Sequence, residues 1–180
     1  MAAVPSPGRV LLITGPAGSG KTTLASRLAA ERAWEPVAED DHWVRQGWGA
    51  GLRTAEQERV VQAGVVDELA SLSAAGRHAV LDLVVYQEPP NPLSAYRARL
   101  GERSIPVATL ALTPTVDEII SRMRARGRPG DLADLDARRW DAEWQLHCVR
   151  ASAVDPAWVI DPTGLTPDET LARALALVGG

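Results

Sequence analysis

The sequence has no phenylalanine, one cysteine and one lysine among its 180 residues. A single cysteine, Cys148, excludes an intramolecular disulfide and any zinc site built from several thiolates, and we expect it to be a small buried residue on a helix. The three histidines lack metal-ligand spacing, so we predict no zinc site. Lys21 is the only lysine, so the other 18 of the 19 basic residues are arginine.

The chain also lacks a basic excess and a long apolar run. Its formal net charge is -4, which disfavours binding of nucleic acid through phosphate neutralisation, so we expect no nucleic-acid partner. Residues 1–9 do not form the charged and apolar regions of a signal peptide. We therefore expect a cytoplasmic protein without a membrane partner. Its length favours a single domain over residues 1–180.

The lone lysine lies in a phosphate-binding motif. The run Gly15-Pro16-Ala17-Gly18-Ser19-Gly20-Lys21-Thr22 matches the P-loop pattern G-x-x-x-x-G-K-[ST]. Backbone N–H groups from Ala17 to Thr22 are expected to face an anion, and the Lys21 ammonium to reach the β- and γ-phosphates. The Thr22 hydroxyl is a candidate Mg²⁺ ligand, and Thr23 continues the nucleotide site. The motif predicts ATP and Mg²⁺ as cofactors, with a chance match as the alternative.

Apolar runs alternate with helical patterns along the chain. We predict strands at residues 10–14, 36–39, 79–85, 107–112 and 158–160. Helix starts are marked by Thr54 with Gln57, Thr115 with Glu118, and Thr166 with Glu169. A charged helix is expected over residues 132–150. This alternation predicts an α/β fold with a five-stranded parallel sheet and right-handed crossovers.

Acidic residues follow the second predicted strand and interrupt the third. Asp40, Asp41, His42 and Trp43 come after the second strand, so their side chains are expected at the carboxyl edge beside the P-loop. We predict that Asp40 is the general base for a substrate hydroxyl and that Asp41 binds substrate or metal. Helix capping or simple solvation is the alternative. Asp82 interrupts the third strand and is a candidate metal ligand with Thr22 and Asp41, unless it forms an internal salt bridge.

Four arginines alternate along the segment before a glycine-rich turn. Such a hinged segment is typical of a lid that closes over a triphosphate, and we predict a helical lid over about residues 124–145. Arg126 and Arg128 are the preferred catalytic pair because they flank Gly127. A solvated helix end is the alternative for at least one of the four residues, which are Arg122, Arg124, Arg126 and Arg128.

Aromatic and amide side chains are candidates for the acceptor pocket. Trp43, Tyr86 and Gln87 follow the second and third strands and are predicted to contact the acceptor with Asp40, Asp41 and His42. Core packing accounts equally well for Trp43. Trp140 and Trp144 are four residues apart on a helix, and we expect them to pack on the body of the protein.

These motifs together resemble the small P-loop kinases that include shikimate kinase, gluconate kinase and chloramphenicol phosphotransferase. The resemblance implies the strand order 2-3-1-4-5, Asp40 as the base, and lid arginines including Arg124 on the phosphates. It also implies that Asp161, Pro162 and Thr163 border the adenine. One departure is the segment 84–90, which replaces the glycine-rich turn of shikimate kinases.

The function predicted from the sequence is ATP-dependent transfer of the γ-phosphate to a hydroxyl of a small polar molecule. Antibiotic-, sugar- and sugar-acid-like acceptors all fit. A nucleoside or nucleotide kinase and a non-catalytic ATP-binding regulator are the alternatives. A GTPase switch is excluded, because its N-K-x-D motif needs a second lysine, and polynucleotide kinase is disfavoured by the negative charge. The sequence leaves open the acceptor, the oligomeric state, the acidic Mg²⁺ ligand and the essential lid arginine.

Overall fold

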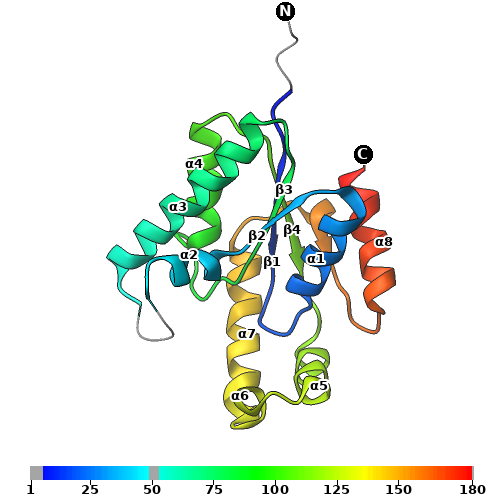
Figure 1. The fold of residues 1–180 in the computed structure, drawn as a ribbon. Coiled ribbons are helices and arrows are strands. Elements are labelled where there is room, and N and C mark those ends of the chain that lie inside the picture. The colour runs from blue at the N-terminus through cyan, green and yellow to red at the C-terminus, as the bar shows by residue number, and fades with distance from the viewer. Residues whose placement is uncertain (1–5, 49–52, 180) are drawn as a thin grey trace, which may run out of the picture.

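The computed structural model describes residues 6–48 and 53–179. In this part of the chain, five parallel strands form one sheet in the order β2-β3-β1-β4-β5 (Figure 1). The predicted fold class and strand order are confirmed. The strands are β1 (Val10–Thr14), β2 (Glu35–Val37), β3 (Ala79–Leu83), β4 (Val107–Leu112) and β5 (Val159–Ile160).

Two pairs of helices cover the two faces of the sheet. Figure 1 shows α1 (Lys21–Arg32) and α8 (Pro167–Val178) on one side, and α3 (Ala55–Ala74) and α4 (Pro92–Glu102) on the other. Side chains of β1 alternate between the two layers, because successive residues of a strand point to opposite faces. Leu12 packs in the α3 and α4 layer, and Leu11 in the α1 and α8 layer. Burial on both faces explains the continuous apolar run of this central strand.

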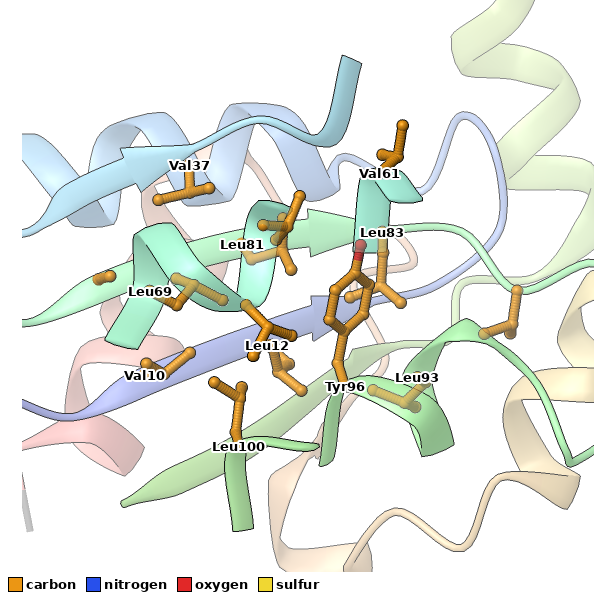
Figure 2. Close-up of a cluster of buried hydrophobic side chains, with 14 of the residues drawn as sticks. Val10, Leu12, Val37, Val61, Leu69, Leu81, Leu83, Leu93, Tyr96 and Leu100 are labelled. Atoms are coloured by element: carbon orange, nitrogen blue, oxygen red, sulfur yellow. The ribbon is translucent and has the colours of Figure 1, made fainter. Parts of the chain in front are cut away.

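The layer beneath α3 and α4 is a dense apolar cluster, shown in Figure 2. Leu12 and Leu81 from the sheet, Leu69 from α3 and Tyr96 from α4 all belong to it. The Tyr96 side chain is fully buried, and burial raises the pKa of its hydroxyl far above the ordinary tyrosine range. Nearby Glu39 adds to this effect. The apolar core therefore extends as far as the residues that directly follow β2.

Helix starts follow the caps read from the sequence. Thr54 and Gln57 form a reciprocal capping box at α3, and Thr166 and Glu169 form one at α8. At α5 (Val116–Arg126) the Thr115 hydroxyl accepts a hydrogen bond from the Glu118 N–H group. Each cap satisfies backbone donors that the first helical turn leaves unpaired.

The carboxyl edge of the sheet carries the remaining helices. They are α2 (Glu39–Arg45), α5, α6 (Pro129–Leu132) and α7 (Leu135–Ala151). In Figure 1, α5, α6 and α7 extend beyond the end of β1. Ile119, Ile120 and Met123 of α5 pack on Ala142 and Leu146 of α7.

Several predicted boundaries were too long. The second strand ends at Val37 because Glu39 already opens α2, and the third ends at Leu83 rather than Val85. Asp134 caps α7, so the helix expected from residue 132 begins at Leu135, and Leu132 instead ends the separate short helix α6. Within the described ranges, none of the helices has both the length and the apolar character needed to span a bilayer.

Candidate active site

The P-loop connects β1 to α1 through glycines that no other residue could easily replace. Gly15 has φ 151°, and a Cβ placed there would lie 2.5 Å from the carbonyl oxygen of Leu112. Gly20, the residue before α1, has φ 98°. Both conformations are strained for residues with a side chain. The motif glycines thus let the loop curl tightly against β4 and turn into the helix.

The start of α1 is suited to an anion. Its first turn contains no acidic residue and its N-cap makes no side-chain hydrogen bond, whereas the first turn of α2 carries Glu39, Asp40 and Asp41. The positive end of the α1 dipole is therefore not neutralised by its own sequence.

Two P-loop amides that we expected to face the anion are used internally instead. Ala17 donates its N–H to Gln145 Oε1 of α7 at 2.7 Å, and Ser19 donates to the Pro16 carbonyl at 3.1 Å. The amide nest available for phosphate is therefore smaller than the run from Ala17 to Thr22. The first of these hydrogen bonds also ties α7 to the loop.

Lys21 is held inside this loop. Its side chain is almost fully buried, with the residue 6% exposed, and Nζ donates to the Pro16 carbonyl at 2.8 Å. Burial lowers the pKa of Lys21 to about 8, with Asp82 opposing the change and Arg126 adding to it. An ammonium that has lost water gains more from a phosphate than a solvated one does.

Thr22 and Asp82 meet at the carboxyl edge. The Thr22 hydroxyl donates to Asp82 Oδ2 at 2.7 Å, and Asp82 lies on β3 opposite Ile13 of β1. Hydroxyl and carboxylate oxygens are the ligands that Mg²⁺ prefers, so this pair fits a magnesium ion. Asp41 is exposed on α2 and, within the described residues, forms no hydrogen bond with either of them.

The P-loop opens into a cavity of about 210 Å³. Arg126 lines it, and its guanidinium donates twice to Asp131 Oδ2, at 2.9 and 2.6 Å. The residues around the cavity are Gly18, Gly20, Lys21, Thr22, Thr23, Arg122 and Arg126.

The four lid arginines thus separate into two groups. Arg122 and Arg126 are one helical turn apart and share a face, while Arg124 lies between them and is exposed on the other side of α5. Arg128 follows Gly127, whose φ of 67° ends α5, and is exposed as the residue before α6. The structure therefore places Arg126 at the phosphate cavity but not Arg124 or Arg128.

Arg122 connects the P-loop to the loop before α8. Its guanidinium donates to the Ser19 carbonyl at 2.9 Å, to the Pro162 carbonyl at 2.7 Å and to Glu118 at 2.7 Å. Asp161 accepts from the Thr163 N–H, and the Thr163 hydroxyl accepts from the Thr115 N–H. Residues 161–163 therefore lie beside the P-loop, and their contact with adenine stays a prediction.

At the start of α2, Asp40 is open to solvent. Its side chain is 88% exposed and pairs with Arg53 at 3.5 Å, and Arg53 in turn lies 4.2 Å from the Trp43 ring centroid. Because α2 starts directly after β2, this carboxylate projects from the same edge as the P-loop. Asp40 is therefore accessible from solvent, with a long ion pair to Arg53.

Tyr86 lies in the loop after β3, near enough to the first turn of α2 for its charges to act on the Tyr86 hydroxyl. It lines a cavity of about 130 Å³ together with Ala17 of the P-loop and Asp141 of α7. Desolvation raises the pKa of Tyr86, Arg53 lowers it, and Asp40, Asp141 and Glu39 raise it further. The loop after β3 thus lies near both the first turn of α2 and α7.

Two other predicted acceptor contacts are wrong. His42 is buried and bonded to Glu68 of α3 at 2.8 Å, and Trp43 is buried in the core. On α2 both residues turn toward α3, so packing accounts for them. Gln87 is exposed, but its side-chain amide donates to the Pro90 carbonyl and so shapes the loop after β3.

The expectation that Trp140 and Trp144 pack on the body is wrong for Trp140, whereas Trp144 is partly covered and donates its indole N–H to the Tyr86 carbonyl. Trp140 is 64% exposed and Trp144 is 40% exposed. The α7 face that packs on the protein is formed by Ala142, Leu146 and Val149.

Sequence reasoning missed Gln145, Arg53 and Asp141. Gln145 could have been found, because it is a polar residue within the apolar face of α7 and is itself buried. Arg53 and Asp141 carry no local signal, since only the fold brings them beside Asp40 and Tyr86.

This arrangement defines a class of protein. A P-loop on the central strand of a 2-3-1-4-5 parallel sheet, with an acidic helix start and a helical lid at the same edge, is a P-loop kinase fold. The chain belongs to the AAA domain family AAA_33, whose model matches residues 10–147.

Solved structures agree with this fold. A sugar kinase from Janibacter sp. HTCC2649 is 24% identical, with 96% of this chain and 95% of that chain covered and a TM-score of 0.66. A gluconokinase from Sinorhizobium meliloti 1021 is 16% identical, covering 97% and 93%, with a TM-score of 0.63. The APS kinase CysC of Mycobacterium tuberculosis, in complex with AMPPNP and APS, is 16% identical, covering 98% and 100%, with a TM-score of 0.65.

The predicted resemblance to small P-loop kinases is thus confirmed. A search of curated protein sequences finds no match.

Proposed function

We propose that the protein transfers the γ-phosphate of ATP to a hydroxyl group of a small polar molecule. The observation that carries the proposal is the convergence of phosphate and acceptor groups at one edge of the sheet. Buried Lys21 and the Thr22–Asp82 pair lie at the P-loop, and exposed Asp40 projects from the neighbouring helix start. Support also comes from the neighbouring structures, which include small-molecule kinases and one with a bound ATP analogue.

Asp40 acts as the base in this proposal. Its carboxylate accepts the proton of the acceptor hydroxyl, whose oxygen forms a bond to the γ-phosphorus. The bond from that phosphorus to the β,γ-bridging oxygen breaks, and ADP leaves. Asp40 needs to separate from Arg53 to accept the proton, and their 3.5 Å exposed pair is weak enough to allow this.

Lys21 and Arg126 supply positive charge to the phosphates. Lys21 sits where burial strengthens its attraction for the transferring group, and Arg126 exchanges Asp131 for phosphate oxygens. Thr22 and Asp82 would hold Mg²⁺, and the bound ion would neutralise part of the phosphate charge. Arg128 can contribute only if the turn at Gly127 rearranges on closure, because it is exposed in this structure.

The decisive measurement is ADP release over a panel of hydroxyl compounds, with Mg-ATP and purified protein. Asp40→Asn should lower kcat by about 10²- to 10⁴-fold without changing ATP affinity, as removal of a general base does. Asp41→Asn is the matched control, since it removes the adjacent exposed carboxylate, and it should leave kcat within about twofold. Equal kcat for wild type and Asp40→Asn would exclude Asp40 as the base. ATP binding without transfer to any acceptor would instead indicate the regulator alternative.

A further inference from the structure

A buried glutamine on α7 has a donor group that the protein itself does not use. Gln145 is 5% exposed, although the other buried residues of α7 are all apolar. A polar side chain in such a position costs free energy unless it forms hydrogen bonds. One bond runs from the Ala17 N–H to Gln145 Oε1 at 2.7 Å. The carboxamide nitrogen at the other end has no role in the phosphoryl transfer proposed above.

The bond to the P-loop decides which way the carboxamide points. Because a backbone N–H can only donate, the atom that faces Ala17 is the oxygen, and Nε2 with its two donors points away from this amide. Within residues 6–48 and 53–179, Nε2 has no hydrogen-bond partner, and it is not one of the unpaired side-chain atoms that are fully closed off from open space. Nε2 therefore keeps access to open space although the residue is buried.

The open space beside Gln145 is the cavity of about 130 Å³ next to the P-loop. Gln145 and Asp141 line it from α7, where residues four apart are neighbours on one face, and Ala17 and Tyr86 line it from two loops. Pockets that bury a whole drug-sized ligand measure roughly 300–1,000 Å³. This cavity therefore suits one end of a small acceptor.

The polar groups of the cavity match a hydroxyl group. Gln145 Nε2 is a donor. Asp141 is an acceptor, because Arg138 bonds its Oδ2 at 3.1 Å and no residue of the described ranges bonds its Oδ1. A hydroxyl accepts one hydrogen bond and donates another, so it satisfies both groups at once. A carbonyl or ether oxygen leaves Asp141 without a donor, and an ammonium leaves Nε2 without an acceptor.

The charges of the cavity disfavour an anionic group. Asp131 and Asp141 line it together with Arg138, which already pairs with Asp141. Arg126 approaches Asp131 from the phosphate cavity and is paired with it. A carboxylate bound here would meet two other carboxylates without an unpaired cation among the lining residues.

We propose that this cavity is a hydroxyl-recognition subsite, in which Gln145 and Asp141 bind a second, non-reacting hydroxyl group of an uncharged polyol acceptor. This inference rests on the proposed kinase function and names its substrate class. Since Gln145 is bonded to the P-loop, the bound hydroxyl fixes the acceptor relative to the loop that holds the phosphates. The carboxamide is oriented before the acceptor arrives, so less rotamer entropy is lost on binding.

Acceptor pairs that differ by one hydroxyl group test this proposal in the ADP-release assay with Mg-ATP. The pairs are trans-1,2-cyclohexanediol and cyclohexanol, D-ribose and 2-deoxy-D-ribose, and D-glucose and 2-deoxy-D-glucose. For at least one pair, kcat/KM of the wild type should be at least tenfold higher with the additional hydroxyl, as expected for the hydrogen bonds it forms. Turnover with equal kcat/KM in every pair would overturn the inference and leave the kinase function intact.

Two variants separate hydroxyl recognition from the bond that ties α7 to the P-loop. Gln145→Glu keeps an oxygen for the Ala17 N–H but loses the Nε2 donors, whereas Gln145→Leu loses both. Each should lower the kcat/KM ratio within the discriminating pair about tenfold, and this ratio cancels any general loss of stability or nucleotide binding. Gln62→Leu makes the same exchange on α3 outside the cavity and should leave the ratio unchanged. A wild-type ratio in Gln145→Glu with a reduced ratio in Gln145→Leu would show that Gln145 only ties α7 to the loop.

A binding measurement keeps the test independent of phosphoryl transfer. In ¹⁵N-labelled protein, the side-chain NH₂ signals of Gln145 are assigned by their loss in Gln145→Glu and followed in titrations with the same compounds, with and without AMPPNP. The member with the additional hydroxyl should shift these signals more than its partner does. Such shifts without ADP release would refute the kinase function and leave the subsite in place. Signals that no polyol shifts would overturn the inference, and shifts by AMPPNP alone would assign Nε2 to phosphate instead.

Discussion

Lys21 should lose its proton near pH 8 in the ligand-free protein and keep it when a nucleotide is bound. Burial places its pKa at about 8 instead of 10.5, and the only nearby carboxylate with a resolved effect, Asp82, does not compensate fully. The triphosphate of ATP brings several negative charges to the same place. The ammonium form should therefore be stabilised in the complex and its pKa should rise.

The size of the effect follows from the pKa. With a value near 8, about 90% of Lys21 is charged at pH 7 and about 10% at pH 9. If only the ammonium form binds ATP, the apparent Kd rises about tenfold between these pH values. Nucleotide binding at pH 8 should take up about half a proton, since half of the free lysine is neutral.

The pH dependence of folding stability is opposite in sign to that produced by a lysine that gains an acidic partner on folding. The folded-state pKa lies below the unfolded value, so the cost of burying the ammonium is fully present below about pH 8. This cost is relieved as pH rises from about 8 to 10.5, where the unfolded chain binds more protons.

Because Lys21 is the only lysine, the assay is direct. Protein labelled with ¹³C at lysine Cε gives a single side-chain resonance, whose chemical shift is followed from pH 6 to 11 with and without AMPPNP. A midpoint near 8 that moves upward with AMPPNP supports the reasoning. A free-protein midpoint near 10.5 would refute the effect of burial, and an unchanged midpoint with nucleotide bound would refute the role of Lys21 at the phosphates. Calorimetry in buffers of different ionisation enthalpy measures the proton uptake.

Three further predictions concern the lid, the loop and the core. Asp131→Asn releases Arg126 from its carboxylate and should lower the Kd for ATP about two- to fivefold in calorimetry; a higher Kd would contradict competition between Asp131 and phosphate. Gly15→Ala places a Cβ against the Leu112 carbonyl and should lower Tm by several degrees as well as weaken ATP binding, so an unchanged Tm in a thermal melt would show that the loop relaxes. Leu12→Ala removes a fully buried side chain and should cost about 2–5 kcal/mol of unfolding free energy in a urea titration, and a cost below about 1 kcal/mol would contradict the packing described.

The fold could be predicted from the sequence because its signals are local. The runs 10–14 and 107–112 are apolar except for one threonine each, as is typical of strands buried on both faces, and the structure gives the same bounds. Thr54 and Thr166 mark helix starts through hydrogen bonds to residues three positions away. Such signals depend only on residues that are close in the chain, so they can be recognised without the tertiary structure.

Which tryptophans are buried and which are exposed could not be predicted from the sequence. Trp43 and Trp140 both follow polar or charged segments and look alike in sequence, yet one is buried under α3 and the other is exposed on α7. Which face of an amphipathic helix turns inward depends on the element that covers it. In α7, Ala142 and Leu146 meet α5, so the indoles on the far side are left outside.

The sequence alone determined the nucleotide-binding chemistry. The order of residues 15–22 places glycines, an ammonium and a hydroxyl within one loop, and no distant residue is needed to recognise the motif. Only the tertiary structure decided the partners of that loop. Asp82 reaches Thr22 because β3 lies beside β1. Gln145 reaches Ala17 because α7 returns to the loop, and Trp144 of α7 donates to the Tyr86 carbonyl for the same reason. Contacts between residues 58 to 128 positions apart depend on how the strands and helices pack, which no local pattern specifies.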